Sequence, residues 1–455
     1  MTRGSRPAAV LAAILALATP SARPAALAPN VILVLADDLG PGEVNCYGGQ
    51  TAPTPNLDRM AKEGIRFTRY YSASPICSAS RCGLLTGQFP ARWQITSYLQ
   101  TRAGNRACEQ ADFLDPKAPA LPRALKAAGY ATAHVGKWHL GGGRDVVDPP
   151  KFAAYGYDQG LGTWESPEPH PEITARDWIW SAADPVKRWD RTRWMVDRTL
   201  DFLDAHPERP CFVNLWLDDT HTPWVPSADD QKLGKNGRAS GRGDTPDRLR
   251  RVVIEMDRQI GRLLDLIRAK PSARPTIVLF LADNGPLPTF EGARTVGLRG
   301  SKLSLYEGGV RLPLIAWGPG IVAEGSTDES SVIGAVDLFP TLCRICGADL
   351  PADYRSDGED RSVALLGRPS PRKRSLFWEY GRNDRSFAYP GGADRSPNLA
   401  VLDGDWKLLV NADGSQTALY QVGRDPKETQ DLAHKEPVVS RRLREAVLAW
   451  RRSLP

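Results

Sequence analysis

The chain has 455 residues, a formal net charge of +6, 41% hydrophobic residues and 25% charged residues. A chain of this length can bury a large core and form more than one domain, and its composition excludes a fibrous or intrinsically disordered protein. The positive charge is too small and diffuse to indicate a nucleic-acid partner, although it would help to attract an acidic ligand.

The N-terminus has the features of a signal peptide, residues 1–28. Two arginines precede an apolar run that is too short to span a bilayer, and small residues follow at the cleavage sites. Cleavage after Ala28 would leave Pro29 first, which is unfavourable, so cleavage after Ala18 is the alternative. No later apolar run has the length of a membrane helix. We therefore expect a periplasmic or extracellular protein without a membrane anchor.

Apolar runs of strand length alternate with amphipathic helical segments along residues 29–360. This alternation predicts a doubly wound, mostly parallel α/β sheet, which we take as the larger domain. Glu255 and Asp257 are expected on the solvated outer face of their helix. The expected strands are 31–36, 130–135, 211–217, 276–282 and 310–317, and the expected helices are 55–64, 121–129, 191–205, 248–267 and 335–346.

A smaller second domain is predicted for residues 361–455. Short strand-like segments with turn residues between them precede a final amphipathic helix, which favours a small antiparallel α+β arrangement. The expected strands are 374–380, 400–410 and 419–421, and the expected closing helix is 443–452.

Polar side chains follow four of the expected parallel strands. Ligands of open α/β sheets bind at the carboxyl ends of the strands, so residues far apart in the sequence should meet at one edge. The carboxylate and amide oxygens in this group suit Ca²⁺ or Mg²⁺ rather than zinc. The polar residues are Asp37 and Asp38 after the first strand, Lys137 and His139 after the second, His221 after the third, and Asp283 and Asn284 after the fourth.

A short polar stretch, Cys77-Ser78-Ala79-Ser80-Arg81, leads from a turn into an expected helix and is followed by Thr86-Gly87. Ser78 or Ser80 is the expected N-cap. A helix N-terminus has free N–H groups and partial positive charge, which together with the Arg81 cation suit an anion. A single cysteine is more often a buried apolar residue, so the functional interpretation depends on the whole stretch.

This stretch resembles the signature of the type I, formylglycine-dependent sulfatases of the alkaline phosphatase superfamily, Cys-x-(Pro/Ala)-x-Arg followed by Thr-Gly. Ala79 stands where the family usually has Pro. The Gly-Lys-Trp-His-Leu-Gly string at 136–141, His221 before Thr-Pro, and the segment 300–313 that contains Lys302 also resemble family motifs. The similarity runs from about residue 30 to about residue 435, with interruptions at 142–188 and 225–245.

The resemblance implies a sulfuric ester hydrolase in which a dedicated maturation enzyme oxidises Cys77 to formylglycine. The implied metal is Ca²⁺, with Mg²⁺ less favoured, and its implied ligands are Asp37, Asp38, Cys77, Asp283 and Asn284. The implied catalytic residues are Cys77, Arg81, Lys137, His139, His221 and Lys302, of which Lys137, His221 and Lys302 also bind the substrate.

The implied mechanism starts from the hydrated aldehyde at position 77. One of its hydroxyls, activated by the metal, attacks sulfur, while Arg81 and the lysines neutralise developing charge. His221, together with Lys302, protonates the leaving oxygen, and His139 takes a proton from the second hydroxyl so that sulfate is expelled.

The sequence does not identify the substrate. We expect a sulfated carbohydrate, and the alternative is a small aryl or alkyl sulfate. Tryptophans in the region 152–194 either contact a sugar or pack the insert. The alternatives to a sulfatase are a phosphonate monoester or phosphodiester hydrolase of the same superfamily, and an unmodified, inactive protein that binds sulfated glycans. These tryptophans are Trp164, Trp178, Trp180, Trp189 and Trp194.

The chain has seven cysteines. Export permits disulfides, but no pairing can be deduced from their spacing. Cys343 and Cys346 lie in an apolar helical run without a second pair, which favours buried thiols or one disulfide over a metal or redox site.

Overall fold

The computed structural model describes residue 1 and residues 27–173, 181–230, 244–270, 274–386 and 392–455. Residues 2–26, which make up most of the predicted signal peptide, lie outside the described residues. Within the described ranges, no helix has both the length and the apolar character needed to cross a membrane.

A nine-stranded sheet forms the centre of the molecule, in the order β4-β3-β5-β1-β6-β7-β2-β8, with β9 paired to β2. The first five strands of this order are parallel, and four of them, β1, β3, β5 and β6, are buried at every residue. Such continuous apolar strands are typical of a parallel sheet covered on both faces. The predicted mostly parallel α/β fold is confirmed. The strands are β4 (Gln159–Gly162), β3 (Ala131–Gly136), β5 (Cys211–Trp216), β1 (Asn30–Ala36) and β6 (Thr276–Ala282).

The other side of the sheet contains a strand that was not predicted. β2 (Ile65–Tyr71) lies between the antiparallel β7 (Arg311–Trp317) and the short parallel strands β8 (Ser326–Asp328) and β9 (Ile333–Gly334). Arginines interrupt its apolar residues, so its sequence lacks the apolar run by which the other strands were recognised.

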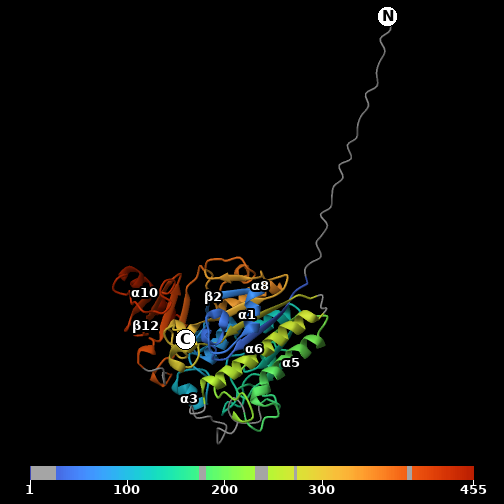
Figure 1. Cartoon of the computed structure of the whole chain (residues 1–455). Coiled ribbons are helices and arrows are strands. Elements are labelled where there is room, and N and C mark those ends of the chain that lie inside the picture. The colour runs from blue at the N-terminus through green and yellow to red at the C-terminus, as the bar shows by residue number, and fades with distance from the viewer. Residues whose placement is uncertain (2–26, 174–180, 231–243, 271–273, 387–391) are drawn as a thin grey trace.

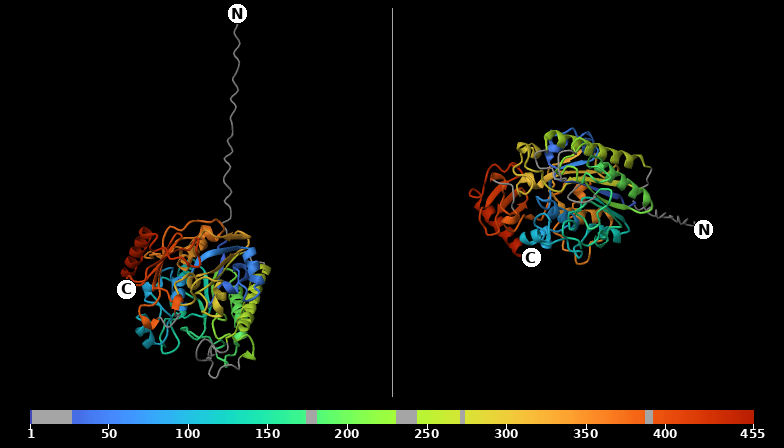
Figure 2. Two further views of the ribbon diagram at one scale, coloured as in Figure 1. Left: turned by 60° about the vertical axis from the view of Figure 1, so that its left-hand side comes forward. Right: turned by 90° about the horizontal axis from the view of Figure 1, so that it is seen from below.

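Helices cover both faces of the sheet (Figure 1). α5 and α6 lie side by side on one face together with α1, whereas α2, α4 and α8 pack against one another on the other face (Figures 1 and 2). The fold is therefore doubly wound, as predicted. The helices are α1 (Pro55–Lys62), α2 (Cys77–Thr86), α3 (Arg102–Ala107), α4 (Leu121–Ala127), α5 (Arg191–Ala205), α6 (Pro246–Ala269), α7 (Glu307–Val310), α8 (Leu338–Cys346) and α9 (Ser362–Leu365).

Asp257 of α6 is buried, so the prediction of a solvated side chain there is wrong. Its Oδ1 accepts a hydrogen bond from Leu57 N at 2.8 Å, and its Oδ2 accepts from Asn56 N at 3.1 Å. Those N–H groups belong to the first turn of α1, where no partner exists within the helix. The carboxylate of one helix therefore caps another helix 200 residues away in the chain.

The C-terminal part forms a separate antiparallel sheet in the order β10-β11-β12-β13, on which α10 packs at the edge of the molecule (Figure 2). The single strand predicted at 400–410 is a hairpin, because Gly404 adopts a positive φ of 60° and reverses the chain there. The antiparallel prediction is confirmed, and a domain boundary near residue 361 stays a prediction. The elements are β10 (Leu376–Glu379), β11 (Leu399–Asp403), β12 (Trp406–Val410), β13 (Ala418–Gln421) and α10 (Pro437–Arg452).

A buried group of charges joins the two sheets. Lys407 Nζ of β12 lies 2.8 Å from Glu307 Oε1 and 3.2 Å from Glu428 Oε1, and all three side chains are inaccessible to solvent. Glu428 Oε2 also accepts a hydrogen bond from Glu307 N at 2.6 Å. Glu307 begins α7, five residues after Lys302, so the small sheet anchors the segment that carries this lysine.

The Asp257→Ala variant is expected to lower the free energy of unfolding by about 1–2 kcal/mol, because N–H groups at the start of α1 lose their acceptor. Urea unfolding followed by circular dichroism measures this. Glu255→Ala is the matched control on the same helix, since Glu255 pairs with Arg258 near the surface and such pairs contribute about 0–1 kcal/mol. Equal losses in the two variants would contradict the capping role.

Candidate active site

The polar residues predicted at the strand ends lie together at the carboxyl edge of the parallel strands. Asp37, Asp38 and Asp283 are buried, and Asp38 N donates a hydrogen bond to Asp283 Oδ1 at 3.1 Å. Asn284 Nδ2 donates to Asp38 Oδ1 at 2.7 Å. Residues from β1 and β6 thus form one acidic group, because these two strands are direct neighbours in the sheet.

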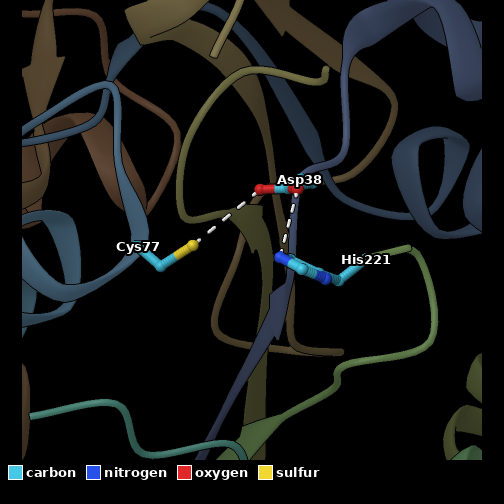
Figure 3. A group of neighbouring side chains, drawn as sticks. All are labelled: Asp38, Cys77 and His221. Carbon is cyan, nitrogen blue, oxygen red and sulfur yellow. Dashed lines mark hydrogen bonds and ion pairs between the residues drawn. The ribbon is translucent and has the colours of Figure 1, made fainter. Parts of the chain in front are cut away.

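Cys77 opens α2 and faces this acidic group. Its Sγ lies 3.5 Å from Asp37 Oδ1 and 3.9 Å from Asp38 Oδ1. From the opposite side, His221 Nε2 lies 3.6 Å from Asp38 Oδ2, so the thiol and the imidazole point toward the same carboxylate (Figure 3).

The expected N-caps of this helix are wrong. Ser78 and Ser80 lie inside α2, whose N-cap is Ile76, and Ser78 Oγ instead accepts a hydrogen bond from Leu99 N at 2.9 Å. The helix begins earlier than the serines suggest because the extended Ile76 turns directly into it. Cys77 is consequently the first helical residue.

Each of the three acids is paired with a different cation. Lys137 Nζ donates to Asp37 Oδ2 at 2.5 Å, and Lys302 Nζ lies 2.6 Å from Asp38 Oδ1. Arg81 donates to Asp283 Oδ2 through both Nη2, at 2.7 Å, and Nε, at 3.0 Å. Arg81 is wholly buried and also lies over the ring of Trp216.

These pairs set the charge of the acids. Burial alone would raise the pKa of Asp37, but Lys137 and the neighbouring cations hold it well below its usual range. Burial likewise opposes ionisation of Asp38, and Lys302 outweighs it, so that the pKa is lowered. Burial and the charge of Asp37 raise the pKa of Asp283 to about 7.

The donor atoms of the site fit a hard divalent cation. Ligand atoms of Asp37, Cys77 and Asp283 lie within 4.8 Å of one another, as do those of Asp38, Cys77 and His221. Asn284 Oδ1 is buried and has no hydrogen-bond partner among the described residues, which leaves one more oxygen for a ligand. An oxygen-rich set of this kind suits Ca²⁺ or Mg²⁺.

The two histidines belong to the same site but have different surroundings. Burial and the nearby Lys302 lower the pKa of His221 to about 4, and its Nδ1 lies 2.6 Å from Thr222 O. Burial lowers the pKa of His139 to about 3. Both rings are therefore neutral near pH 7.

A cavity of about 390 Å³ opens onto these residues. Its wall includes side chains that sequence reasoning missed, because they do not follow strand ends and two of them lie in the interval where family similarity is interrupted. The predicted residues in the wall are Cys77, Lys137, His139, His221 and Lys302, and the additional polar residues are Tyr98, Gln100, Arg144, Glu165 and Ser386.

Backbone contacts fix the loops that carry His221 and Lys302. Arg188 Nη2 donates to His221 O at 3.0 Å, and Lys302 N donates to Pro286 O at 2.7 Å. Leu303 N donates to Pro75 O at 2.9 Å, two residues before the site cysteine. Arg188 is a further residue that the sequence did not single out.

No tryptophan belongs to the cavity wall formed by the described residues. Trp194 is buried and packs against His170, as expected if it packs the insert instead of contacting a sugar. Trp164 lies beside Arg144. Trp178 and Trp180 lie outside the described residues.

The seven cysteines, all in described parts of the chain, are free thiols. Cys343 and Cys346 are buried in α8, so of the two favoured alternatives they are buried thiols and not a disulfide.

A sequence profile of the sulfatases matches residues 29–348. The chain belongs to the sulfatase family. This sulfatase is 35% identical to the human N-acetylgalactosamine-6-sulfatase, over 88% of this chain and 80% of that protein. It is 31% identical to human arylsulfatase A, over 93% and 85% of the two chains, and 27% identical to an N-acetylgalactosamine-6-O-sulfatase of Bacteroides thetaiotaomicron, over 92% of each.

Solved structures share the fold. The crystal structure of Ps i-CgsB in complex with a neocarrahexaose superposes with a TM-score of 0.74 at 22% identity, covering 93% of both chains. A B. thetaiotaomicron sulfatase from work on glycosaminoglycan metabolism superposes with a TM-score of 0.72 at 24% identity, covering 93% of this chain and 99% of that one.

The protein is therefore a sulfuric ester hydrolase, and the prediction of this enzyme class is confirmed. Sulfatases generally use a formylglycine and a divalent metal. The described residues fit both groups, since the only cysteine beside the carboxylates is Cys77 and since Asn284 Oδ1 has no partner among the residues described.

Calcium is expected to stabilise protein that has been treated with EGTA. A cation present at about 100 times its Kd adds about 2.7 kcal/mol to the free energy of unfolding, which raises the melting temperature by a few degrees. Differential scanning fluorimetry with CaCl₂ and MgCl₂ measures the shift for each ion.

Asn284→Ala should weaken this calcium-dependent shift because a ligand oxygen is lost. Asn214→Ala is the matched control, since Asn214 is also buried with an unpartnered Oδ1 among the described residues but lies within β5. The control should lower the melting temperature and retain the shift. An identical calcium response in the two variants would contradict the assignment of Asn284 as a ligand.

Proposed function

We propose that this sulfatase hydrolyses a sulfate ester of a carbohydrate, using formylglycine formed from Cys77 and a divalent cation, with Ca²⁺ favoured over Mg²⁺. The observation that carries this proposal is the position of Cys77, whose Sγ lies 3.5 Å from Asp37 and 3.9 Å from Asp38 in the wall of a cavity lined by cations. The proposed metal ligands are Asp37, Asp38, Asp283, Asn284 and residue 77.

Formylglycine would supply a hydrated aldehyde at position 77, with one hydroxyl for attack on sulfur and another for the later release of sulfate. The cation would supply Lewis-acid stabilisation of negative oxygen. Lys137 and Lys302 reach the cavity and bind the sulfate oxygens, because an ester sulfate is an anion and both ammonium groups are buried with little competing water. Arg81 holds Asp283 in place and adds positive charge beneath residue 77.

His221 Nε2 and Lys302 Nζ both lie near Asp38 Oδ2, at 3.6 Å and 2.7 Å, and the leaving oxygen of the ester would lie beside them. The Lys302 ammonium can protonate the leaving oxygen and prevent the formation of a poor alkoxide leaving group, while the neutral His221 ring binds the sulfate. His139 is the group that accepts the proton of the second hydroxyl of residue 77, and its neutral state near pH 7 is the form that can do so.

A carbohydrate substrate is supported by three of the similar proteins, which carry the names N-acetylgalactosamine-6-sulfatase or N-acetylgalactosamine-6-O-sulfatase. The cavity agrees with this substrate class, because Tyr98, Gln100 and Ser386 offer hydrogen-bonding groups for hydroxyls next to the sulfate site. A cavity of about 390 Å³ lies within the range usual for small-molecule sites.

The N-terminal segment supports export to the periplasm or the extracellular space. The proposed partners are a sulfated glycan or small molecule and a separate formylglycine-generating enzyme that acts on Cys77 before or during export. The proposed catalytic domain is 29–360 and the proposed C-terminal domain is 361–455.

Cys77→Ala is expected to abolish turnover, and Cys77→Ser is expected to lose turnover and to retain covalently bound sulfate, because a serine ester has no second hydroxyl for its release. Activity on an aryl sulfate and intact-mass analysis measure the two effects. Cys82→Ala is the matched control in the same helix, since Cys82 is buried away from the carboxylates. Normal activity of Cys77→Ala would refute the proposal, and peptide mass spectrometry of the wild type should find an aldehyde at residue 77.

Sulfate release should exceed phosphodiester hydrolysis when aryl sulfate and aryl phosphodiester are compared at equal concentration. The reason is that Lys137, His221 and Lys302 in the cavity wall suit a compact anion with a single organic substituent, whereas a phosphodiester has two. A screen of sulfated mono- and disaccharides, including N-acetylgalactosamine 6-sulfate and 4-sulfate, then measures free sulfate. Preferential phosphodiester turnover would indicate the rival hydrolase, and binding without any turnover would indicate a glycan-binding protein.

A further inference from the structure

The two ring nitrogens of His139 have different partners. Nε2 lies 3.1 Å from Leu99 O and 3.3 Å from Glu165 Oε2. Nδ1 is buried and has no hydrogen-bond partner among the residues that the structure describes. The ring belongs to the wall of the cavity that also contains Cys77.

Both neighbours of Nε2 can only accept a hydrogen bond. Leu99 O is a backbone carbonyl, and the Glu165 carboxylate is ionised, since Arg144 holds it with two hydrogen bonds and its pKa is lowered although burial opposes ionisation. A neutral imidazole carries one proton, and here that proton has acceptors only at Nε2. The lone pair is therefore at Nδ1.

Glu165 is itself held rigidly. Its Oε1 accepts hydrogen bonds from Arg144 Nε at 3.1 Å and from Arg144 Nη2 at 2.8 Å. Its backbone oxygen accepts from His139 N at 2.9 Å, so one residue contacts both the ring and the backbone of the histidine. His139 has a positive φ of 55°, a conformation that costs energy for a residue with a Cβ and is maintained by such contacts.

We propose that Glu165, held by Arg144, is a positioning residue that keeps the proton of His139 on Nε2 and leaves Nδ1 as the base that releases sulfate. The inference rests on the proposed function, in which His139 accepts a proton from residue 77. Glu165 contacts neither the reacting atoms nor the cation ligands, and it acts through the histidine.

Release of sulfate moves one proton and two electron pairs. The proton of the free hydroxyl on residue 77 moves to Nδ1, and the electron pair of that O–H bond forms the carbonyl of the aldehyde. The C–O bond to the sulfate group breaks, and its electron pair leaves with sulfate. The resulting imidazolium carries its positive charge beside the Glu165 carboxylate, which stabilises it, and the proton later passes to water.

Kinetic tests use Glu165→Ala and Glu165→Gln in the full-length, matured enzyme with an aryl sulfate. The alanine variant should lose about 10- to 100-fold in kcat, and KM should fall with it so that kcat/KM is retained, because release of the covalent sulfate and not binding is impaired. Intact-mass analysis during turnover should find covalently bound sulfate on residue 77. Glu165→Gln, which retains an acceptor oxygen, should fall between the alanine variant and the wild type.

Glu172→Gln is the matched control. Glu172 lies near Glu165 in the sequence and accepts a hydrogen bond from Trp194 Nε1 at 2.9 Å, but it is not part of the cavity wall. Its kcat and KM should match those of the wild type. A Glu165→Ala variant that raises KM, or that loses activity without accumulating bound sulfate, would show a merely structural role and overturn the inference.

A measurement without turnover tests the tautomer directly. In ¹⁵N-histidine spectra of the wild type, the signals that disappear in His139→Asn should have the Nε2–H pattern. An Nδ1–H pattern would overturn the inference. Failure of the proposed function is distinguishable, because it would appear as normal turnover of Cys77→Ala, whatever the spectra and the Glu165 variants show.

Discussion

Three carboxylates buried at one edge of a sheet are the constraint on which the rest of this structure depends. Burying an ionised carboxylate without a partner costs much free energy. Each of the three is therefore paired with a cation from a different part of the chain: Lys137 after β3, Arg81 in α2 and Lys302 before α7. The acids themselves follow β1 and β6. The charges can be compensated only when the parallel strands are in register and α2 has docked, so the active site and the fold form together.

The grouping of polar residues at the strand ends was predictable because its signals are local. Apolar runs of strand length end directly at polar residues, and parallel strands must deliver those residues to the same edge. Asp37, Asp38, Asp283 and Asn284 accordingly lie in contact, as the pattern required. The roles assigned to Lys302 and His221 came from similarity to family motifs, since nothing in composition or spacing distinguishes either from a surface lysine or a structural histidine.

The features that the sequence did not predict depend on tertiary contacts. β2 has arginines within its apolar pattern, and its strand character comes from β7 and β8 on either side. Asp257 lies four residues after Val253 and three before Ile260, on the buried face of α6, where it caps α1; the prediction gave its charge more weight than this spacing. Glu165 and Arg144 lie in an interval without recognisable elements, and only the folded chain brings their ion pair against His139. Long-range partners of this kind leave no periodic trace in a single sequence.

The buried contact of Lys407 with Glu307 and Glu428 has a consequence for the order of synthesis. Glu307 is translated one hundred residues before Lys407, and until the lysine arrives its carboxylate is paired with Arg311, at 3.4 Å, and lacks its fully buried partner. The helix α7, and with it the segment that carries Lys302, is therefore anchored in its final arrangement only after the last strands have been made. A nascent chain completes this wall of the cavity late in translation.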